Sequence, residues 1–201
     1  MEIVALFGDG VGISTLDVDN EKILNNMKNL EFKPTDSALD GDAHCQTSFL
    51  FNVLNQKEFA TLKENIIEKV NQYIQDALHY EIDFQIFNSW CTCTFENGGF
   101  SQKHLHSNSW LSGVYYPEDY DAGIRFYRPI PQHWSIHTPK EFNFLNQAYF
   151  DIFARKNRLI LFSSTLEHSV LKNNENKKRF SLAFNLVPKG PIGFGDSRII
   201  Y

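Results

Sequence analysis

The sequence predicts a single, mainly β domain of the α+β class, a β-barrel or sandwich of jelly-roll type with one long flanking helix. Aromatic residues, which favour pleated sheet surfaces, are frequent, with 18 Phe, 8 Tyr and 3 Trp among 201 residues. Short segments of alternating side chains, separated by Gly, Pro, Asn and Asp, fill the second half of the chain. With 42% hydrophobic residues the chain can bury one sizeable core, whereas two would be cramped.

The first part of this domain, residues 1–81, is expected to hold a strand, a loop and a supporting helix. Residues 2–7 are mostly apolar and indicate an opening strand. Residues 8–12 contain three glycines, but their spacing is not that of a dinucleotide-binding motif, so they predict a turn. Residues 31–48 are polar and rich in Asp, which predicts a loop.

One long helix is predicted after this loop, with an apolar stripe packed on a sheet. Asn55, with Glu58 three residues later, indicates a capped start. Apolar residues then recur at three- and four-residue steps, as in an amphipathic helix. These residues are Phe59, Leu62, Ile66, Val70, Tyr73, Ile74 and Leu78.

Residues 82–187 are predicted to form the jelly-roll core, and residues 188–201 an irregular tail. Side chains alternate in residues 82–95, which predicts a strand with two distinct faces. One predicted face comprises Ile82, Phe84, Ile86, Asn88, Trp90, Thr92 and Thr94. Further strands are predicted at residues 110–116, 123–128, 148–154, 158–163, 168–171 and 179–187.

Composition argues against several functional classes. The formal net charge is −5 and no long basic run occurs, which disfavours nucleic acid as a partner. Cys45, Cys91 and Cys93 are too few and too oddly numbered for a disulfide framework. The first residues do not resemble a signal peptide, and no apolar stretch is long enough to span a membrane. We therefore expect a cytoplasmic protein without a membrane partner, of an oligomeric state that the sequence leaves open.

Three features in the core could carry chemistry: His104-Leu105-His106, His168 and Arg179. On an extended strand, positions i and i+2 point the same way, so both imidazoles of the pair would face one side. Oxygen activation at iron(II) needs three protein ligands on one face of the metal and open positions opposite. A dicarboxylate co-substrate bound there would need a cation for its far end, and arginine pairs bidentately with carboxylate.

Each feature taken alone has an ordinary explanation. A His-x-His pair is common by chance, a lone histidine such as His168 is more often structural, and a lone arginine is usually solvated. Their occurrence in this order, each in a strand context, is what favours a metal centre.

The ordered set of segments around these residues resembles the iron(II)- and 2-oxoglutarate-dependent oxygenases. The resemblance is strongest to a branch of small 2OG-Fe(II) oxygenases from marine bacteria and phages, and it extends to prolyl-hydroxylase-like members. It implies a double-stranded β-helix fold, which is a cupin-like jelly roll. The matching segments are residues 88–90, 104–106, 112–116, 123–126, 161–170 and 179–185.

The resemblance implies a role for several residues. His104 and His168 match the two histidine ligands of the family, and Arg179 matches the residue that binds the far carboxylate of 2-oxoglutarate. Ser181, two residues further along the strand, would face the same pocket, and Tyr116 matches a tyrosine that hydrogen-bonds this carboxylate or else is a core aromatic. Most of the family has Asp where this chain has His106; the closer branch shares this histidine, which keeps it as the third metal ligand.

The function implied is a 2-oxoglutarate-dependent non-haem iron dioxygenase that hydroxylates a C–H bond and releases succinate and CO₂. Fe(II), 2-oxoglutarate and O₂ are the expected cofactors and co-substrates, with ascorbate as a reductant, and the substrate is a small molecule or a protein side chain. Two alternatives stay open. One is a cupin-like protein that binds a metal and a small ligand without oxygenase activity, and the other is a three-histidine dioxygenase that needs no 2-oxoglutarate.

A further set of residues is predicted to surround the substrate or cover the site. The aromatic-rich segment 129–147 is a candidate lid over the iron, with a surface excursion as the alternative. Within it, His133 and His137 have a helical ligand spacing, but nearby prolines disfavour a second metal site. Candidate substrate-lining residues are Trp90, Trp110, Arg125, Phe126 and Arg128.

Overall fold

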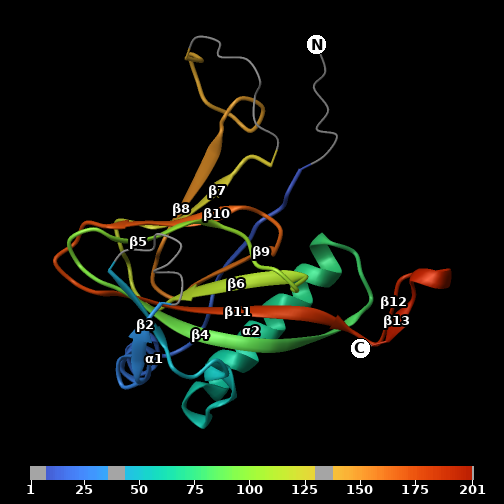
Figure 1. Cartoon of the computed structure of the whole chain (residues 1–201), viewed down its shortest axis with the longest axis horizontal. Helices are drawn as coiled ribbons and strands as arrows, with labels where there is room; N and C mark the ends of the chain where they lie inside the picture. Colours follow the sequence, from blue (N-terminus) through green and yellow to red (C-terminus); the bar gives the residue numbers. More distant parts are fainter. Residues whose placement is uncertain (1–7, 36–43, 130–137, 201) are drawn as a thin grey trace.

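The computed structural model describes residues 8–35, 44–129 and 138–200, and this part of the chain forms three layers. A helical layer covers one face of a large β-sheet, and a smaller sheet covers the opposite face (Figure 1). Both sheets are antiparallel, which confirms the predicted mainly β class and the jelly-roll arrangement. The strand predicted at residues 2–7 lies outside the described residues.

The strands divide into two facing sheets and a separate hairpin. The seven-stranded sheet has the order β1 (Gly12–Thr15), β9 (Arg158–Ser163), β6 (Leu111–Tyr116), β11 (Arg179–Lys189), β4 (Asp83–Thr94), β3 (Cys45–Ser48) and β2 (Phe32–Pro34). The four-stranded sheet has the order β5 (Gly99–His104), β10 (His168–Asn173), β7 (Gly123–Tyr127) and β8 (Tyr149–Phe153). The tail predicted as irregular instead contains a short hairpin of β12 (Pro191–Ile192) and β13 (Ile199–Ile200).

Side-chain alternation along the central strands separates a hydrophobic core from a polar cavity. On β11 the even-numbered residues, from Phe180 to Leu186, are buried against the helices. The odd-numbered residues, from Arg179 to Asn185, lie on the opposite face, towards the four-stranded sheet. Neighbouring β6 alternates likewise, with Tyr115 in the core under the helices and Tyr116 between the sheets. This alternation aims one face of β11 at the space between the two sheets.

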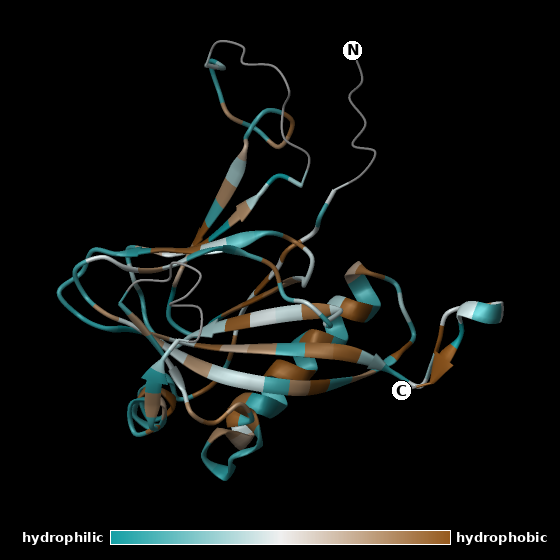
Figure 2. Cartoon of the chain, viewed as in Figure 1, coloured by the Kyte–Doolittle hydropathy of each residue, from teal (hydrophilic) through white to brown (hydrophobic). Residues whose placement is uncertain are grey.

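The helical layer is built from two helices. The predicted long helix is present as α2 (Ala60–Gln72), which continues in a π-helical turn at Tyr73–Ala77. Its predicted stripe is confirmed, and hydrophobic residues concentrate along α2 and the strands beside it (Figure 2). No helix among the described residues is long and apolar enough to cross a membrane.

Three details of the N-terminal part differ from the prediction. The predicted cap is absent, because α2 follows two 3-10 turns (Val53–Asn55 and Lys57–Phe59) and no side chain caps its start. A second helix, α1 (Asn20–Lys28), was missed, although Asp19 caps it by accepting a hydrogen bond from the Lys22 N–H at 3.0 Å. The segment predicted as a loop also contains strands β2 and β3.

Strand β4 does not keep the single face that alternation predicts. Its pairing with β11 shifts register between Asn88 and Ile86, so Phe87 is an extra, bulged residue. Before the bulge, Ile86 and its even-numbered neighbours pack towards the helices, and after it the odd-numbered Cys91 and Cys93 do so. The bulge therefore turns Trp90 and Thr92 towards the cavity.

A tight turn carries the chain from one sheet to the other. Asn97 and Gly98 have φ angles of 63° and 103°, values that Asn and Gly tolerate best. Directly after this turn, β5 begins in the four-stranded sheet and ends at His104.

Candidate metal centre

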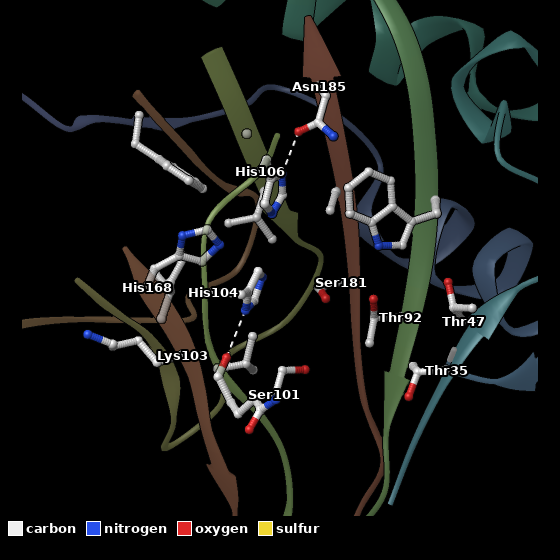
Figure 3. Close-up of a pocket in the computed structure, with 18 of the residues that line it drawn as sticks. Thr35, Thr47, Thr92, Ser101, Lys103, His104, His106, His168, Ser181 and Asn185 are labelled. Atoms are coloured by element: carbon white, nitrogen blue, oxygen red, sulfur yellow. Dashed lines mark hydrogen bonds between the residues drawn. The ribbon is translucent and has the colours of Figure 1, made fainter. Parts of the chain in front are cut away.

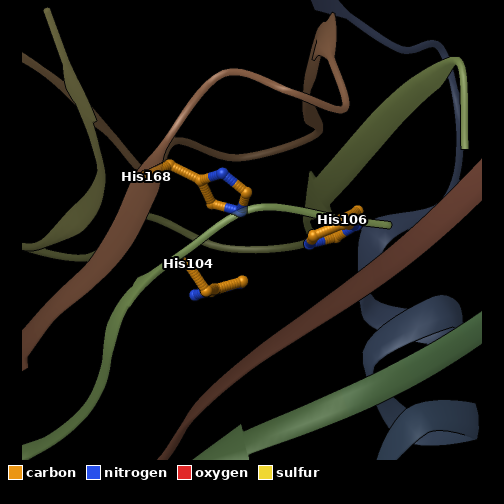
Figure 4. A group of neighbouring side chains, drawn as sticks. All are labelled: His104, His106 and His168. Atoms are coloured by element: carbon orange, nitrogen blue, oxygen red, sulfur yellow. The ribbon is translucent and has the colours of Figure 1, made fainter. Parts of the chain in front are cut away.

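Three histidines from two distant segments of the chain converge between the two sheets. His104 ends β5 and His168 begins β10, and the two are direct partners in the antiparallel pairing of these strands. His106 lies just beyond β5, where its backbone N–H donates to the Ser164 carbonyl at 2.9 Å. The nearest ring nitrogens of the three lie within 4.8 Å of one another, and Figure 4 shows the imidazoles grouped around one space. Three ligand atoms at this separation can hold a metal ion.

Each imidazole is held by a hydrogen bond at Nδ1. The partner is the carbonyl oxygen of Gln102 for His104, at 2.7 Å, and that of Leu166 for His168, at 2.9 Å. For His106 the nearest partner is the side-chain oxygen Oδ1 of Asn185, at 2.5 Å, and the Ser112 hydroxyl lies 3.1 Å from the same nitrogen. A carbonyl oxygen only accepts, so Nδ1 carries the proton and Nε2 keeps its lone pair.

The electrostatics of the site keep two of these rings neutral. Burial, reinforced by the neighbouring His104, lowers the pKa of His168 to about 3. Burial also lowers the pKa of His106, although its hydrogen bond to Asn185 acts in the opposite direction. Neutral imidazoles are the form that binds a metal ion, so the site needs no proton loss from these two groups near neutral pH.

The histidines face a cavity of about 580 Å³ that lies between the sheets. Hydroxyl-bearing residues of the large sheet, among them Thr47, Thr92 and Ser181, lie across the cavity from the histidines (Figure 3). Its apolar lining includes Val114, Ile124, Phe162 and Val170. Both polar and apolar walls therefore surround the space next to the histidines.

Arg179 is a buried cation at one end of the strand that forms the cavity wall. It is 1% exposed, and it lies on the same face of β11 as Ser181 and Asn185, which line the cavity. Its Nη2 donates to the Leu171 carbonyl at 2.8 Å, whereas its Nη1 is buried without any partner. No carboxylate of the described residues pairs with it, and burial lowers the pKa of its guanidinium. A buried, incompletely paired guanidinium is costly, which makes it a candidate anion-binding group.

Two further predicted residues lie near these groups. Tyr116 is 1% exposed and lines the cavity, and its interaction with Arg179 partly offsets the rise in its pKa caused by burial. Trp90 also lines the cavity, with its ring centroid 5.7 Å from that of His106.

The other candidate substrate-lining residues do not line the cavity. Phe126 is buried behind the site, with its ring centroid 6.0 Å from that of His168. Trp110 packs edge-on against Tyr80 on the helical side of the large sheet. Arg125 pairs with Asp151 at 2.6 Å.

The predicted lid is only partly described. Arg128 lies just before the segment 129–147 and donates hydrogen bonds to the carbonyls of Gln147 and Phe144. These bonds connect the residue that precedes the segment with the end of the segment. Residues 138–147 do not line the histidine cavity, and His133 and His137 lie outside the described residues. The lid role of residues 129–147 stays a prediction.

The polar residues behind His106 were not predicted from the sequence. Asn185, Ser112 and Ser164 are buried and connected by hydrogen bonds of 2.7 and 2.8 Å. Their one sequence signal is the occurrence of small polar residues inside otherwise apolar strands. Such a signal cannot identify the partners, because Asn185 is 79 residues away from His106.

Comparison with known proteins agrees with this geometry. Residues 88–185 match the family described as "Putative 2OG-Fe(II) oxygenase", and no curated protein matches the chain. Among solved structures, the non-heme alpha ketoglutarate dependent epimerase SnoN from nogalamycin biosynthesis has a TM-score of 0.65 at 12% identity, over 89% of this chain and 76% of SnoN.

Two other solved structures show the same likeness. HygX from Streptomyces hygroscopicus, with nickel, 2-oxoglutarate and hygromycin B bound, has a TM-score of 0.60 at 11% identity, over 90% of this chain and 83% of HygX. A Pseudomonas putida prolyl-4-hydroxylase has a TM-score of 0.57 at 15% identity, over 88% of this chain and 92% of that enzyme. At such identities the likeness shows that the fold is shared.

Proposed function

We propose that this chain, whose residues 88–185 match the family described as "Putative 2OG-Fe(II) oxygenase", is an iron(II)- and 2-oxoglutarate-dependent dioxygenase that hydroxylates a C–H bond. The observation that carries the proposal is the pairing of two features in one region of the fold. Three imidazoles offer Nε2 to a common point, and a buried guanidinium on the wall strand has an unused donor. The first feature suits a metal, and the second suits a dicarboxylate.

The residues present fit iron(II) and 2-oxoglutarate. His104, His106 and His168 would hold the metal, because three ligands from one side leave positions open opposite them. Arg179 would bind the far carboxylate of 2-oxoglutarate through its unpartnered Nη1, with Tyr116 and Ser181 as nearby hydroxyl donors. When bound, this pair of groups supplies the oxidation of a substrate C–H bond by O₂, with succinate and CO₂ as by-products.

The protein's own contribution is position, charge and exclusion of water. Three neutral ligands leave the iron one unit more positive than two histidines and a carboxylate would, which favours an anionic co-substrate. The apolar residues Val114, Ile124 and Phe162 line the cavity and exclude water from the reacting groups.

The substrate is proposed to be a small molecule or a protein side chain. The cavity of about 580 Å³ exceeds what 2-oxoglutarate needs and lies within the usual range for small-molecule sites. The solved structures that share this fold differ in their ligands and activities: HygX has hygromycin B bound, and the Pseudomonas putida protein is a prolyl-4-hydroxylase. Cys91 and Cys93 are buried free cysteines, which suits the proposed cytoplasmic location, where thiols stay reduced.

The test is an anaerobic titration with iron(II) and 2-oxoglutarate, followed by exposure to air. We expect a weak visible charge-transfer band from the chelate, then succinate formation that is stimulated by a suitable substrate. His168→Ala should remove the band, and Arg158→Met, which alters an arginine outside the cavity lining, should retain it. A band without any succinate across a broad substrate panel would favour a binding protein. Oxygen uptake without 2-oxoglutarate would favour a three-histidine dioxygenase.

A further inference from the structure

His106 differs from the other two histidines in how its ring is held. His104 and His168 each donate to the backbone carbonyl two residues earlier in the chain, so their orientation follows from the backbone alone. His106 has side-chain partners instead: the nearer is Asn185 on β11, which is 6% exposed, and the other is the Ser112 hydroxyl, 3.1 Å from Nδ1. The orientation of the third imidazole thus depends on a side chain from a different strand.

A buried chain of hydroxyls stands behind this amide. Ser112 lies opposite Asn185 in the register of β6 and β11 and donates to Asn185 Oδ1 at 2.7 Å. Its hydroxyl is also 2.8 Å from that of Ser164, which in turn lies 2.8 Å from that of Ser109. Asn185 Oδ1 thus receives hydrogen bonds from both His106 and Ser112, while its amide nitrogen points away from His106 (Figure 3).

The direction of the Asn185 amide decides which nitrogen of His106 can bind a metal. With Oδ1 towards the ring, Nδ1 must carry the proton and Nε2 keeps its lone pair. With the amide reversed, Nδ2 would donate to Nδ1, the proton would move to Nε2, and the third ligand would be lost. His104 and His168 have no such alternative, because a backbone carbonyl cannot become a donor.

We propose that Asn185 is the positioning residue of this centre, whose amide oxygen holds the His106 proton on Nδ1 and thereby presents Nε2 as the third metal ligand. The inference rests on the proposed metal function of the three histidines. Asn185 would thus control His106, the ligand at the position where most of the family that the sequence resembles has aspartate. Removing such a supporting hydrogen-bond partner typically weakens metal binding by about 10- to 100-fold.

Two nearly isosteric substitutions separate this role from simple packing. Asn185→Leu removes the acceptor, and we expect the Kd for cobalt(II), measured anaerobically as an iron(II) substitute, to rise by about 10- to 100-fold. Asn185→Asp offers only acceptors to His106, so its Kd should equal or fall below that of the wild type. Asn88→Leu is the matched control, because Asn88 faces Asn185 in the β4–β11 register but makes no hydrogen bond to His106.

The tautomer of His106 can also be measured directly in the protein with Asn185 unchanged. In the metal-free wild type, the imidazole ¹⁵N spectrum, assigned with a His106→Gln variant, should show His106 protonated at Nδ1. Protonation at Nε2 would overturn the proposal, as would an Asn185→Leu Kd within about threefold of the wild type. So would Asn185→Asp binding as weakly as Asn185→Leu while its thermal unfolding stays at the wild-type temperature.

Failure of the proposed function would look different. If the wild type binds neither cobalt(II) nor iron(II), the metal centre is refuted and this role of Asn185 falls with it. If the wild type binds and the Asn185 variants bind equally well, only the role of Asn185 is refuted.

Discussion

Replacing Arg179 with Met should affect binding and folding in opposite ways. The substitution would remove the cation from a buried ion pair with the bound carboxylate, and leaving one charge of such a pair without its partner costs about 3–5 kcal/mol of binding free energy. At about 1.4 kcal/mol per factor of ten, the Kd of 2-oxoglutarate should rise by roughly two to three and a half orders of magnitude. The metal-free protein would lose one hydrogen bond, from Nη2 to the Leu171 carbonyl, at a cost of about 1 kcal/mol.

That loss of stability is offset by removal of a buried donor without a partner. An unpaired buried group such as Arg179 Nη1 costs about 1–3 kcal/mol, so the free energy of unfolding should stay within about 1 kcal/mol of the wild type or rise. Isothermal titration with 2-oxoglutarate in the presence of a redox-inert metal, together with thermal unfolding of the metal-free protein, measures both quantities.

The matched control is Arg158→Met. Arg158 also has a buried nitrogen without a partner and also donates to a backbone carbonyl, that of Phe153. It lies on β9, however, and not on β11, whose residues Ser181 and Asn185 line the cavity. Its replacement should leave the Kd of 2-oxoglutarate unchanged. An Arg179→Met protein that binds 2-oxoglutarate with a Kd less than about tenfold above the wild type would refute the reasoning, because a loss that small falls below the cost of breaking a buried pair.

Three more outcomes follow from the structure. His168→Ala should weaken iron(II) binding by at least about 100-fold, since two remaining imidazoles cannot supply a three-ligand face; metal analysis after gel filtration that finds full occupancy would contradict this. Tyr116→Phe should raise the Kd of 2-oxoglutarate by about 3- to 10-fold, the value of one hydrogen bond, and an unchanged Kd in titration calorimetry would place Tyr116 in the core alone. Gly113→Ala should lower the free energy of unfolding by about 1–3 kcal/mol, because a Cβ there meets the ring of Phe184; an unchanged denaturation midpoint would show that the ring can move aside.

Local pattern in the sequence was sufficient for most of the elements. The apolar repeat from Phe59 to Leu78 indicates the long helix because its period is that of an α-helix. Successive apolar residues in this repeat are only a few positions apart, so the pattern is visible in a short stretch of sequence. The order of His104, His168 and Arg179 along the chain likewise indicated a candidate centre, because strand alternation and the resemblance to a known family both act on short segments. Helix α1 was missed although its cap is visible in the sequence, since its apolar repeat is short.

Tertiary structure decided what depends on register between distant strands. The bulge at Phe87 reverses which residues of β4 face the cavity, and no local period reports such an inserted residue. The support of His106 by Asn185 depends on β11 lying beside β6, and the unused donor of Arg179 depends on which groups surround it after folding.

The sequence by itself therefore determined the fold class and the long helix, because these follow from periodicities of two and 3.6 residues. It also indicated the chain positions of the candidate ligands, through short segments that resemble a known family. The convergence of three lone pairs, the missing partner of Arg179 and the orientation of the His106 ring were decided only in three dimensions. The physical reason is that hydrogen bonding and desolvation are set by every group within a few ångströms, and in this site those groups come from strands scattered over the second half of the chain.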